Sequence, residues 1–454
     1  MNLYANTSQI EITPELGTVI NGEFTCRYAN KIADPLYAKA FLFKQGQVIL
    51  LIMVVDVCLM KREYLDPIKK KIAAVTSIPV EQQMISSTHT HSAGSVADLL
   101  LAHVDIAYRD YLEKQLIALA SQVMTHVVPA KIAFGKVTKP QHLTCRRYKM
   151  NTAYTSINPV NGAIDEVKTN PFGLEDFILS RTTVPDPDVC YIALQTLEGE
   201  WLGILANYGL HYVGDCERGT ISADYFGVFA KQLVSKLHPT NDMVVAMSNG
   251  TSGEINIWDF IDGNRYPAGY HEKSKLIGED IAESIRESVL GLEWDEHPQL
   301  MSHYEDVAVS LRRIPNDILE QSRKIVCSTD YESLSYTDTD LMEKVYAREQ
   351  LLLQHYPEVS LFPLQCFKIG YTIIGALGGE FFSETGLKLK QLYPQYFTIC
   401  LANDYVGYVP PEAELAKGGY ETWRCRSSYL DQSAEQVIRL RLSQIIEDFS
   451  PHEE

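Results

Sequence analysis

Two histidines, His89 and His91, are separated by a single residue in the stretch "STHTHSAG". The two histidines follow a segment, 82–88, that is typical of a strand. While the chain stays extended, alternate residues point to the same side, so the two rings lie together. Such a pair can hold a metal ion, transfer a proton or form a solvated, hydrogen-bonded loop. The pair alone does not distinguish these possibilities.

Other ionisable residues also follow predicted strands. His211 comes after the strand predicted over 201–209, and Glu380 comes after the one predicted over 367–377. Taken singly, His211 is typical of a structural histidine and Glu380 of a carboxylate at a helix start. Catalytic zinc sites, however, often draw their ligands from distant segments and leave one position open. Further polar residues in similar places are Glu254, Asp404, Tyr405, Tyr408 and Tyr420.

Strands and helices alternate along the chain and must position these residues. The segments 47–57, 61–76, 82–88 and 108–127 read as strand, helix, strand and helix, an order that favours a parallel or mixed sheet. Further strands are predicted at 189–196, 201–209, 243–248, 367–377 and 397–403, and further helices at 222–237, 273–290, 341–354, 382–392 and 433–449. The segment 297–315 is a weak candidate for a change of layer. We therefore expect one α/β domain over residues 1–454, a large mixed β-sheet with packed helices and a metal site at the strand ends.

Composition excludes several classes of function. The formal net charge of −18 disfavours binding to nucleic acid. The longest apolar run, 48–55, is too short to cross a bilayer, and the N-terminus lacks the pattern of a signal peptide. This predicts a cytoplasmic protein for the chain as it stands, or a secreted or periplasmic one if a signal had been removed. The nine cysteines contain no C-x-x-C pair, which predicts reduced, mostly buried thiols. Nothing in the sequence indicates an oligomeric state.

Several motifs together resemble one family. The stretches "STHTHSAG", "GLHYVGD", "ISADYFG", "NGTSGEIN", "GGEFFSETG" and "GYVPPEAELAKGGYE" occur in an order similar to that of the neutral/alkaline (non-lysosomal) ceramidases, and "IEITPELG" is similar to the start of that family. The resemblance covers most of residues 8–440. It implies the catalytic N-terminal α/β domain of that family, which holds one zinc ion and hydrolyses the amide of N-acylsphingosine. We expect the C-terminal immunoglobulin-like domain of the family to have no counterpart here.

The resemblance also assigns roles to particular residues. It implies His89, His211, Glu380 and Tyr420 as zinc ligands, with Tyr408 as an alternative to Tyr420 or as a substrate contact. It places His91 beside the metal as a catalytic group and implies Arg146, more than Arg147, as a substrate-binding residue. Asn256 stands in "GEINIW" where the family has a serine. Asparagine can orient a substrate but cannot act as a nucleophile, so a route through a serine at this position is excluded.

These residues predict a zinc-dependent hydrolase that cleaves a linear amide with a metal-activated water. The substrate would be N-acylsphingosine or another small-molecule or lipid N-acyl compound or ester. One alternative is a serine hydrolase, because Ser248 lies in an A-x-S-x-G stretch and His211 and Asp224 could complete a triad. The other is a zinc-containing relative that binds a lipid or sugar without turnover.

Overall fold

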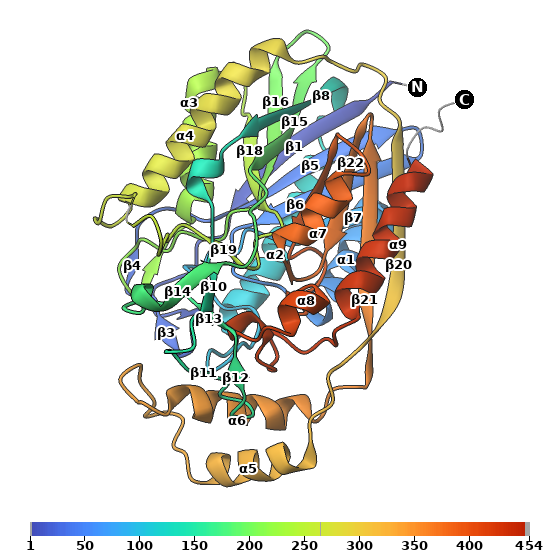
Figure 1. The fold of residues 1–454 in the computed structure, drawn as a ribbon. Helices are drawn as coiled ribbons and strands as arrows, with labels where there is room; N and C mark the ends of the chain where they lie inside the picture. The colour runs from blue at the N-terminus through green and yellow to red at the C-terminus, as the bar shows by residue number, and fades with distance from the viewer. Residues whose placement is uncertain (1, 264, 450–454) are drawn as a thin grey trace.

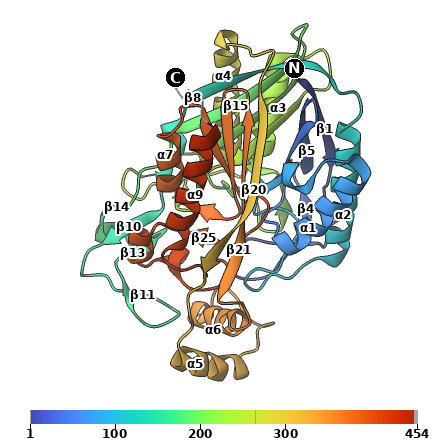
Figure 2. The ribbon, with the colours of Figure 1, turned by 90° about the vertical axis from the view of Figure 1, so that its right-hand side faces the viewer.

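Two β-sheets stacked face to face form the centre of the computed structural model, which describes residues 2–263 and 265–449. Helices cover the outer face of each sheet, so the fold has four layers in the order helix, sheet, sheet, helix (Figures 1 and 2).

The larger sheet has eight strands in the order β18-β16-β15-β8-β1-β5-β6-β7. Its strands are β1 (Tyr4–Glu11), β5 (Tyr37–Gln45), β6 (Val48–Val55), β7 (Gln83–Ser87), β8 (Val128–Thr138), β15 (Asp188–Thr196), β16 (Trp201–Tyr208) and β18 (Val244–Asn249). Only the two edge pairs are parallel, β6 with β7 and β16 with β18. A parallel pair needs a crossover, and helices α1 (Arg62–Thr76) and α3 (Asp224–Leu237) lie in these two connections. The predicted large mixed sheet is confirmed.

The second sheet has four strands in the order β20-β21-β22-β24. Its strands are β20 (Leu300–Ser310), β21 (Val359–Ile369), β22 (Thr372–Leu377) and β24 (Tyr396–Cys400), and α7 (Ser383–Lys390) connects the parallel pair β22 and β24. The prediction of one strand over 367–377 is wrong, because the segment turns at Gly370, whose φ of +62° suits glycine. The change of layer considered at 297–315 coincides with β20, the first strand of this sheet.

Alternation along the strands explains why both sheets are buried on both faces. In β5, Ala40 and Leu42 pack with the helices outside, while Phe41 and Phe43 point into the core between the sheets. The inner core also takes Ile374 and Ala376 of β22. Strands buried on both sides read as continuous apolar runs, as β6 does.

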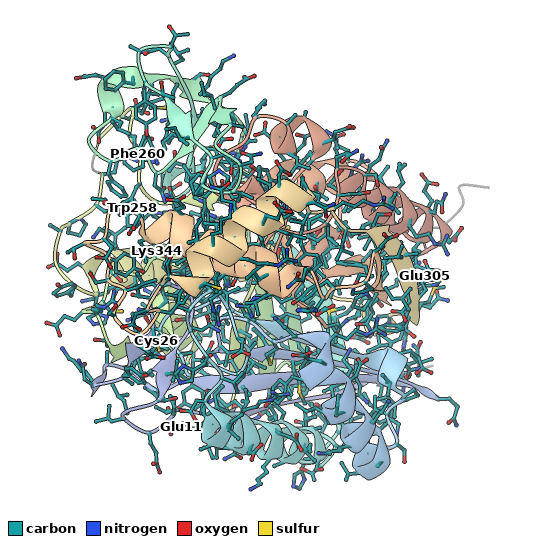
Figure 3. All side chains as sticks on the ribbon, turned by 90° about the horizontal axis from the view of Figure 1, so that it is seen from below. Glu11, Cys26, Trp258, Phe260, Glu305 and Lys344 are labelled. Atoms are coloured by element: carbon teal, nitrogen blue, oxygen red, sulfur yellow. The ribbon has the colours of Figure 1, made fainter. Side chains whose placement is uncertain are left out.

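Helices α1, α2 (Ile106–Val123), α3 and α4 (Glu272–Ser288) cover the eight-stranded sheet, and α7 and α9 (Ala434–Phe449) cover the four-stranded one. The helical pair α5 (Asn316–Cys327) and α6 (Leu341–Leu353) lies beyond the ends of the sheets. Viewed from below, this pair, which carries Lys344, crosses the middle of the molecule, and Glu305 of β20 lies near one edge (Figure 3). No helix in the described ranges is long and apolar enough to cross a membrane.

Short strands make small two- and three-stranded sheets, several of which carry residues of the candidate site. These strands are β2 (Val19–Ile20), β3 (Arg27–Tyr28), β4 (Lys31–Ile32), β9 (Thr144–Cys145), β10 (Arg147–Met150), β11 (Ser156–Ile157), β12 (Ile164–Asp165), β13 (Val167–Thr169), β14 (Ile178–Arg181), β17 (Thr220–Ile221), β19 (Ile255–Asn256), β23 (Glu380–Phe381) and β25 (Tyr408–Val409). The remaining helix is α8 (Glu412–Leu415). That the whole chain is a single domain stays a prediction.

Candidate metal centre

Three side chains from three distant segments meet where strands β7, β16 and β22 end. His89 follows β7, His211 follows β16, and Glu380 lies in β23 just after β22. His89 has a φ of +73°, a conformation that is rare for residues other than glycine, and its N–H donates to the carbonyl of Val57. The fold therefore holds His89 in a strained backbone conformation of the kind found at functional sites.

The ligand atoms of His89, His211 and Glu380 all lie within 4.8 Å of one another. Oε2 of Glu380 is 3.3 Å from Nε2 of His89 and 3.9 Å from Nε2 of His211. All three side chains are almost completely buried. The structure thus brings together three of the four residues predicted as metal ligands.

Hydrogen bonds on the far side of each ring orient both histidines. Nδ1 of His89 lies 2.7 Å from the carbonyl oxygen of Cys58, and Nδ1 of His211 lies 3.3 Å from that of Ser252. A carbonyl can only accept, so each Nδ1 carries the proton and each neutral ring presents a lone pair at Nε2. Metal-binding histidines commonly have this arrangement, in which the second ring nitrogen donates to a backbone carbonyl.

Glu380 is oriented in a similar way. Its Oε1 accepts a hydrogen bond of 2.8 Å from the hydroxyl of Tyr405. Its Oε2 and Nε2 of His211 are buried and have no hydrogen-bond partner among the described residues. Two imidazole nitrogens and a carboxylate oxygen make a donor set found in catalytic zinc sites. The buried atoms that lack partners therefore fit a divalent metal ion, which His89, His211 and Glu380 would hold.

The local electrostatics favour a neutral His211 and an ionised Glu380, and they favour a positive charge at His89. Burial would raise the pKa of Glu380, but the neighbouring His89 and Arg146 lower it below the ordinary value. Burial and nearby positive groups hold the pKa of His211 and of His91 well below the usual range. Burial lowers the pKa of His89, but Glu380 and Cys58 more than offset this and raise it to about 10. A proton or a metal ion beside His89 would balance the buried carboxylate.

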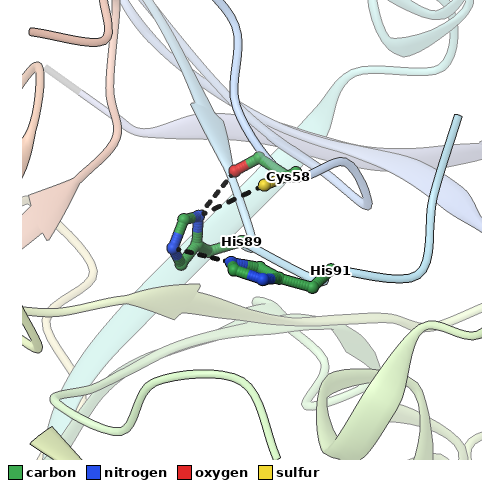
Figure 4. A group of neighbouring side chains, drawn as sticks. All are labelled: Cys58, His89 and His91. Carbon is green, nitrogen blue, oxygen red and sulfur yellow. Dashed lines mark hydrogen bonds between the residues drawn. The ribbon is translucent and has the colours of Figure 1, made fainter. Parts of the chain in front are cut away.

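His91 lies next to these three residues. Its Nε2 is 3.2 Å from Nε2 of His89 (Figure 4), and its ring stacks on Tyr212 with centroids 3.6 Å apart. Gly22 packs on the other side, where a Cβ atom would come within 2.4 Å of Nδ1 of His91. His91 is therefore held in place by neighbours that sequence reasoning did not select. Its catalytic role stays a prediction.

Cys58, His89 and His91 form a second group with ligand atoms close together (Figure 4). The Cys58 thiol, however, lies on the Nδ1 side of His89, where the carbonyl of Cys58 already accepts a hydrogen bond. The ligand atoms of His211 and Glu380 lie near Nε2 of His89, the ring nitrogen that the carbonyl of Cys58 leaves available. The geometry therefore favours the group with His211 and Glu380.

Tyr408 and Tyr420 both lie near the three proposed ligands, but they make different contacts. Tyr408 pairs with Glu380 through the β23–β25 bridge, and its hydroxyl accepts a hydrogen bond of 3.0 Å from Arg146. The Tyr420 ring packs on that of Tyr408 at 5.6 Å, and the Tyr420 hydroxyl has no hydrogen-bond partner in the described part of the chain. Burial, Cys425 and Glu380 raise the pKa of Tyr420. Metal binding by Tyr408 or Tyr420 stays a prediction. Tyr405, which was not predicted as a ligand, donates the hydrogen bond to Glu380.

Arg146 and Arg147 form a paired cluster with Glu421. Arg146 donates from Nε to Oε1 of Glu421 at 2.8 Å, and Arg147 donates from Nη1 to Oε2 at 2.9 Å. Arg147 is fully buried and also donates to the carbonyls of Glu414 and Gly418. Substrate binding by either arginine stays a prediction; the contacts of Arg147 support a role in holding Glu421 in place.

Asn256 is buried in β19, where its side chain donates to Asn170 at 2.6 Å and accepts from the N–H of Trp258. Its proposed action on a substrate stays a prediction.

The alternative triad receives no support from its hydrogen bonds. Ser248 is buried and donates to the carbonyl of Ala206, while Asp224 accepts from the backbone N–H groups of Val213 and Gly214. His211 donates to Ser252 instead. Among the described residues, Ser248, His211 and Asp224 therefore do not hydrogen-bond one another.

The nine cysteines are free in the structure, and six of them are buried, as predicted.

Comparison of the sequence with protein-family models and with curated proteins gives no match. Comparison of the fold with solved structures finds neutral ceramidase from Pseudomonas aeruginosa, with a TM-score of 0.71 and 14% sequence identity over 100% of this chain and 76% of that one. A structure described as ceramidase complexed with C2 gives a TM-score of 0.70, with the same identity and coverage. The family resemblance is therefore supported at the level of the fold.

Proposed function

We propose that this protein is a ceramidase-like, zinc-dependent hydrolase of a linear amide. The observation that carries the proposal is the buried group of His89, His211 and Glu380. Both rings are oriented from Nδ1, and Nε2 of His211 and Oε2 of Glu380 have no hydrogen-bond partner in the described part of the chain. The match of the fold to ceramidase structures supports the same class of reaction.

Each residue then has a defined task. His89, His211 and Glu380 would hold the zinc ion, with Tyr420 or Tyr408 as a further ligand, and Tyr405 would orient Glu380. When bound, zinc lowers the pKa of a water molecule and polarises a carbonyl group. His91, whose pKa lies well below its usual range, would accept a proton at its neutral ring. Arg146 and Asn256 would orient the substrate, an N-acyl lipid such as N-acylsphingosine or a related amide or ester.

The test combines metal analysis with an assay. The purified protein should contain about one zinc per chain and hydrolyse at least one member of a panel of N-acyl lipids, and a chelator should remove the activity reversibly. His89→Ala should lose both the metal and the activity, whereas His297→Ala, at an exposed site, should keep both. Activity that survives in metal-free His89→Ala protein would overturn the proposal.

Two further outcomes would point elsewhere. Activity that resists chelators, together with labelling of Ser248 by a fluorophosphonate, would indicate the serine mechanism. Stoichiometric zinc with lipid binding but no hydrolysis across the panel would indicate a binding protein.

A further inference from the structure

A cavity of about 320 Å³ lies at the start of α1, apart from the three proposed ligands. Segments far apart in the chain line it: Lys61, Arg62, Glu63, Leu311, His355, Tyr356, Pro357, Ser360, Asp404, Tyr405, Arg426 and Tyr429. Cavities of this size hold small organic molecules.

The charged groups of this cavity differ in how well they are paired. Arg62 forms ion pairs with Asp66 and Asp306, and Arg426 forms a two-point pair with Glu349. Lys61 has no ion pair and no hydrogen bond from its ammonium group among the described residues. Lys61 is thus the cation of this cavity that has no partner of its own.

The acidic groups do not satisfy Lys61. The Oδ1 atom of Asp404 already accepts from the backbone N–H groups of Arg62 and Tyr405. Glu63, which also lines the cavity, is exposed and forms no ion pair with Lys61 among the described residues. Burial and the neighbouring Arg426 lower the pKa of Lys61. A negative charge in the cavity would raise this pKa again. The cavity therefore favours an anion.

Neutral hydrogen-bond donors line the remaining wall. The rings of Tyr356 and Tyr429 pack edge to face with centroids 5.4 Å apart, and neither hydroxyl has a hydrogen-bond partner in the described ranges. The adjacent start of α1 adds the positive end of a helix dipole. Tyr405 also lines the cavity, while its hydroxyl holds Glu380 of the candidate metal centre.

We propose that this cavity binds a small molecule through one oxyanion group, held by the Lys61 ammonium and the hydroxyls of Tyr356 and Tyr429. The oxyanion belongs to a carboxylate or a phosphate monoester, and the aromatic rings contact the body of the molecule. The proposal does not depend on the function proposed for the metal centre.

Calorimetric titration of the whole chain with inorganic phosphate, and separately with acetate, tests the proposal at constant ionic strength. At least one anion should bind saturably at one site per chain, and its affinity should fall at least about tenfold in Lys61→Gln. Lys61→Arg should restore much of the affinity, and Lys275→Gln, at an exposed position, should leave it unchanged. Stronger binding of phosphate assigns the site to phosphate monoesters, and stronger binding of acetate assigns it to carboxylates.

The folded state of Lys61→Gln is checked by thermal unfolding, and its zinc content should equal that of the unchanged protein. The absence of saturable binding by both anions up to about 50 mM would overturn the proposal. Equal affinity in the unchanged protein and in Lys61→Gln would also overturn it.

Discussion

Two buried polar clusters in this protein differ in how their carboxylates are paired. In the arginine cluster, Arg146 and Arg147 share Glu421, whose oxygens accept from both guanidinium groups and from Thr169. In the candidate metal centre, Glu380 receives one hydrogen bond from Tyr405, and its other oxygen faces His89 and His211 without a hydrogen bond.

The number of partners within the protein distinguishes a structural carboxylate, Glu421, from a candidate functional one, Glu380. A buried charge is tolerated when opposite charges and hydrogen bonds surround it, and the Glu421 carboxylate meets this condition within the protein. The Glu380 carboxylate meets this condition only in part, so an external cation would balance its remaining charge. Perturbed, incompletely paired groups of this kind are typical of functional sites.

The largest expected effect follows from removing the charge of Glu380. Glu380→Gln keeps the shape of the side chain but loses the carboxylate, and we expect zinc affinity to fall on the order of 10⁴-fold, about 5.5 kcal/mol. Competition with a chromophoric chelator measures this change. Glu384→Gln, four residues further on at a partly exposed site, should change the affinity less than about twofold. Equal effects of the two variants would contradict the comparison.

A substitution in the arginine cluster should lower the stability of the protein and leave its metal binding unchanged. Arg147→Met leaves Glu421 and Glu414 with fewer partners, and we expect it to lower the free energy of unfolding by about 3 to 5 kcal/mol. Denaturant unfolding measures the loss, and the zinc content of the folded fraction should stay the same.

Arg313→Met is the matched control for this change. Arg313 pairs with Glu358 at the surface, where both side chains are mostly exposed, so the stability should change by less than about 1 kcal/mol. A loss of zinc in Arg147→Met, with stability intact, would assign this arginine to the metal centre instead.

Glu254 is an intermediate case, because it is fully buried and hydrogen-bonded but forms no ion pair with any residue that the structure describes. It accepts from the N–H and hydroxyl of Ser383 and from Thr183, yet burial raises its pKa to about 7. The unfolded chain loses this proton near pH 4.3, so the contribution of Glu254 to stability is greatest below that pH and falls as pH rises to about 7.

The predicted fall in stability with rising pH is tested by unfolding the unchanged protein and Glu254→Gln at pH 5 and at pH 8. The stability of the unchanged protein relative to the variant should fall by about 2 to 3 kcal/mol over that interval. A constant difference between the two proteins would show that Glu254 is ionised in the folded state throughout.

The smallest expected effect concerns Tyr405. Tyr405→Phe removes the hydroxyl that orients Glu380, and loss of such a supporting hydrogen bond lowers metal affinity by about 10- to 100-fold. Tyr371→Phe, at an exposed turn, should leave the affinity unchanged. No effect of Tyr405→Phe would mean that the backbone alone positions Glu380.

Much of the fold was predictable from local pattern. The apolar runs at 47–57 and 189–196 correspond to β6 and β15, because strands buried on both faces must be apolar at every position. Strand β8 was not recognised, because its residues alternate between the core and the surface and include Lys131 and Lys136. The hairpin at Gly370 was read as one strand because a tight turn can consist of residues that also suit strands.

The candidate site was predictable in part. His89, His211 and Glu380 follow strands, and the order of their motifs indicated a shared site. Tyr405 was noticed only as one of several polar residues, and Tyr212 was not selected. Neither position carries a local pattern that distinguishes it from the other tyrosines among the 26 of the chain.

The sequence by itself determined the alternating strands and helices, the burial of the sheets and the residue types that can bind a metal. These properties depend on periodicity and side-chain chemistry, which are local. Only the tertiary structure decided that Nε2 of His89, Nε2 of His211 and Oε2 of Glu380 face a common point, that Glu421 pairs with both arginines, and that Tyr405 lines the cavity at the start of α1 and also hydrogen-bonds Glu380. The first two of these relations join residues more than a hundred positions apart, and only the folded chain brings them together.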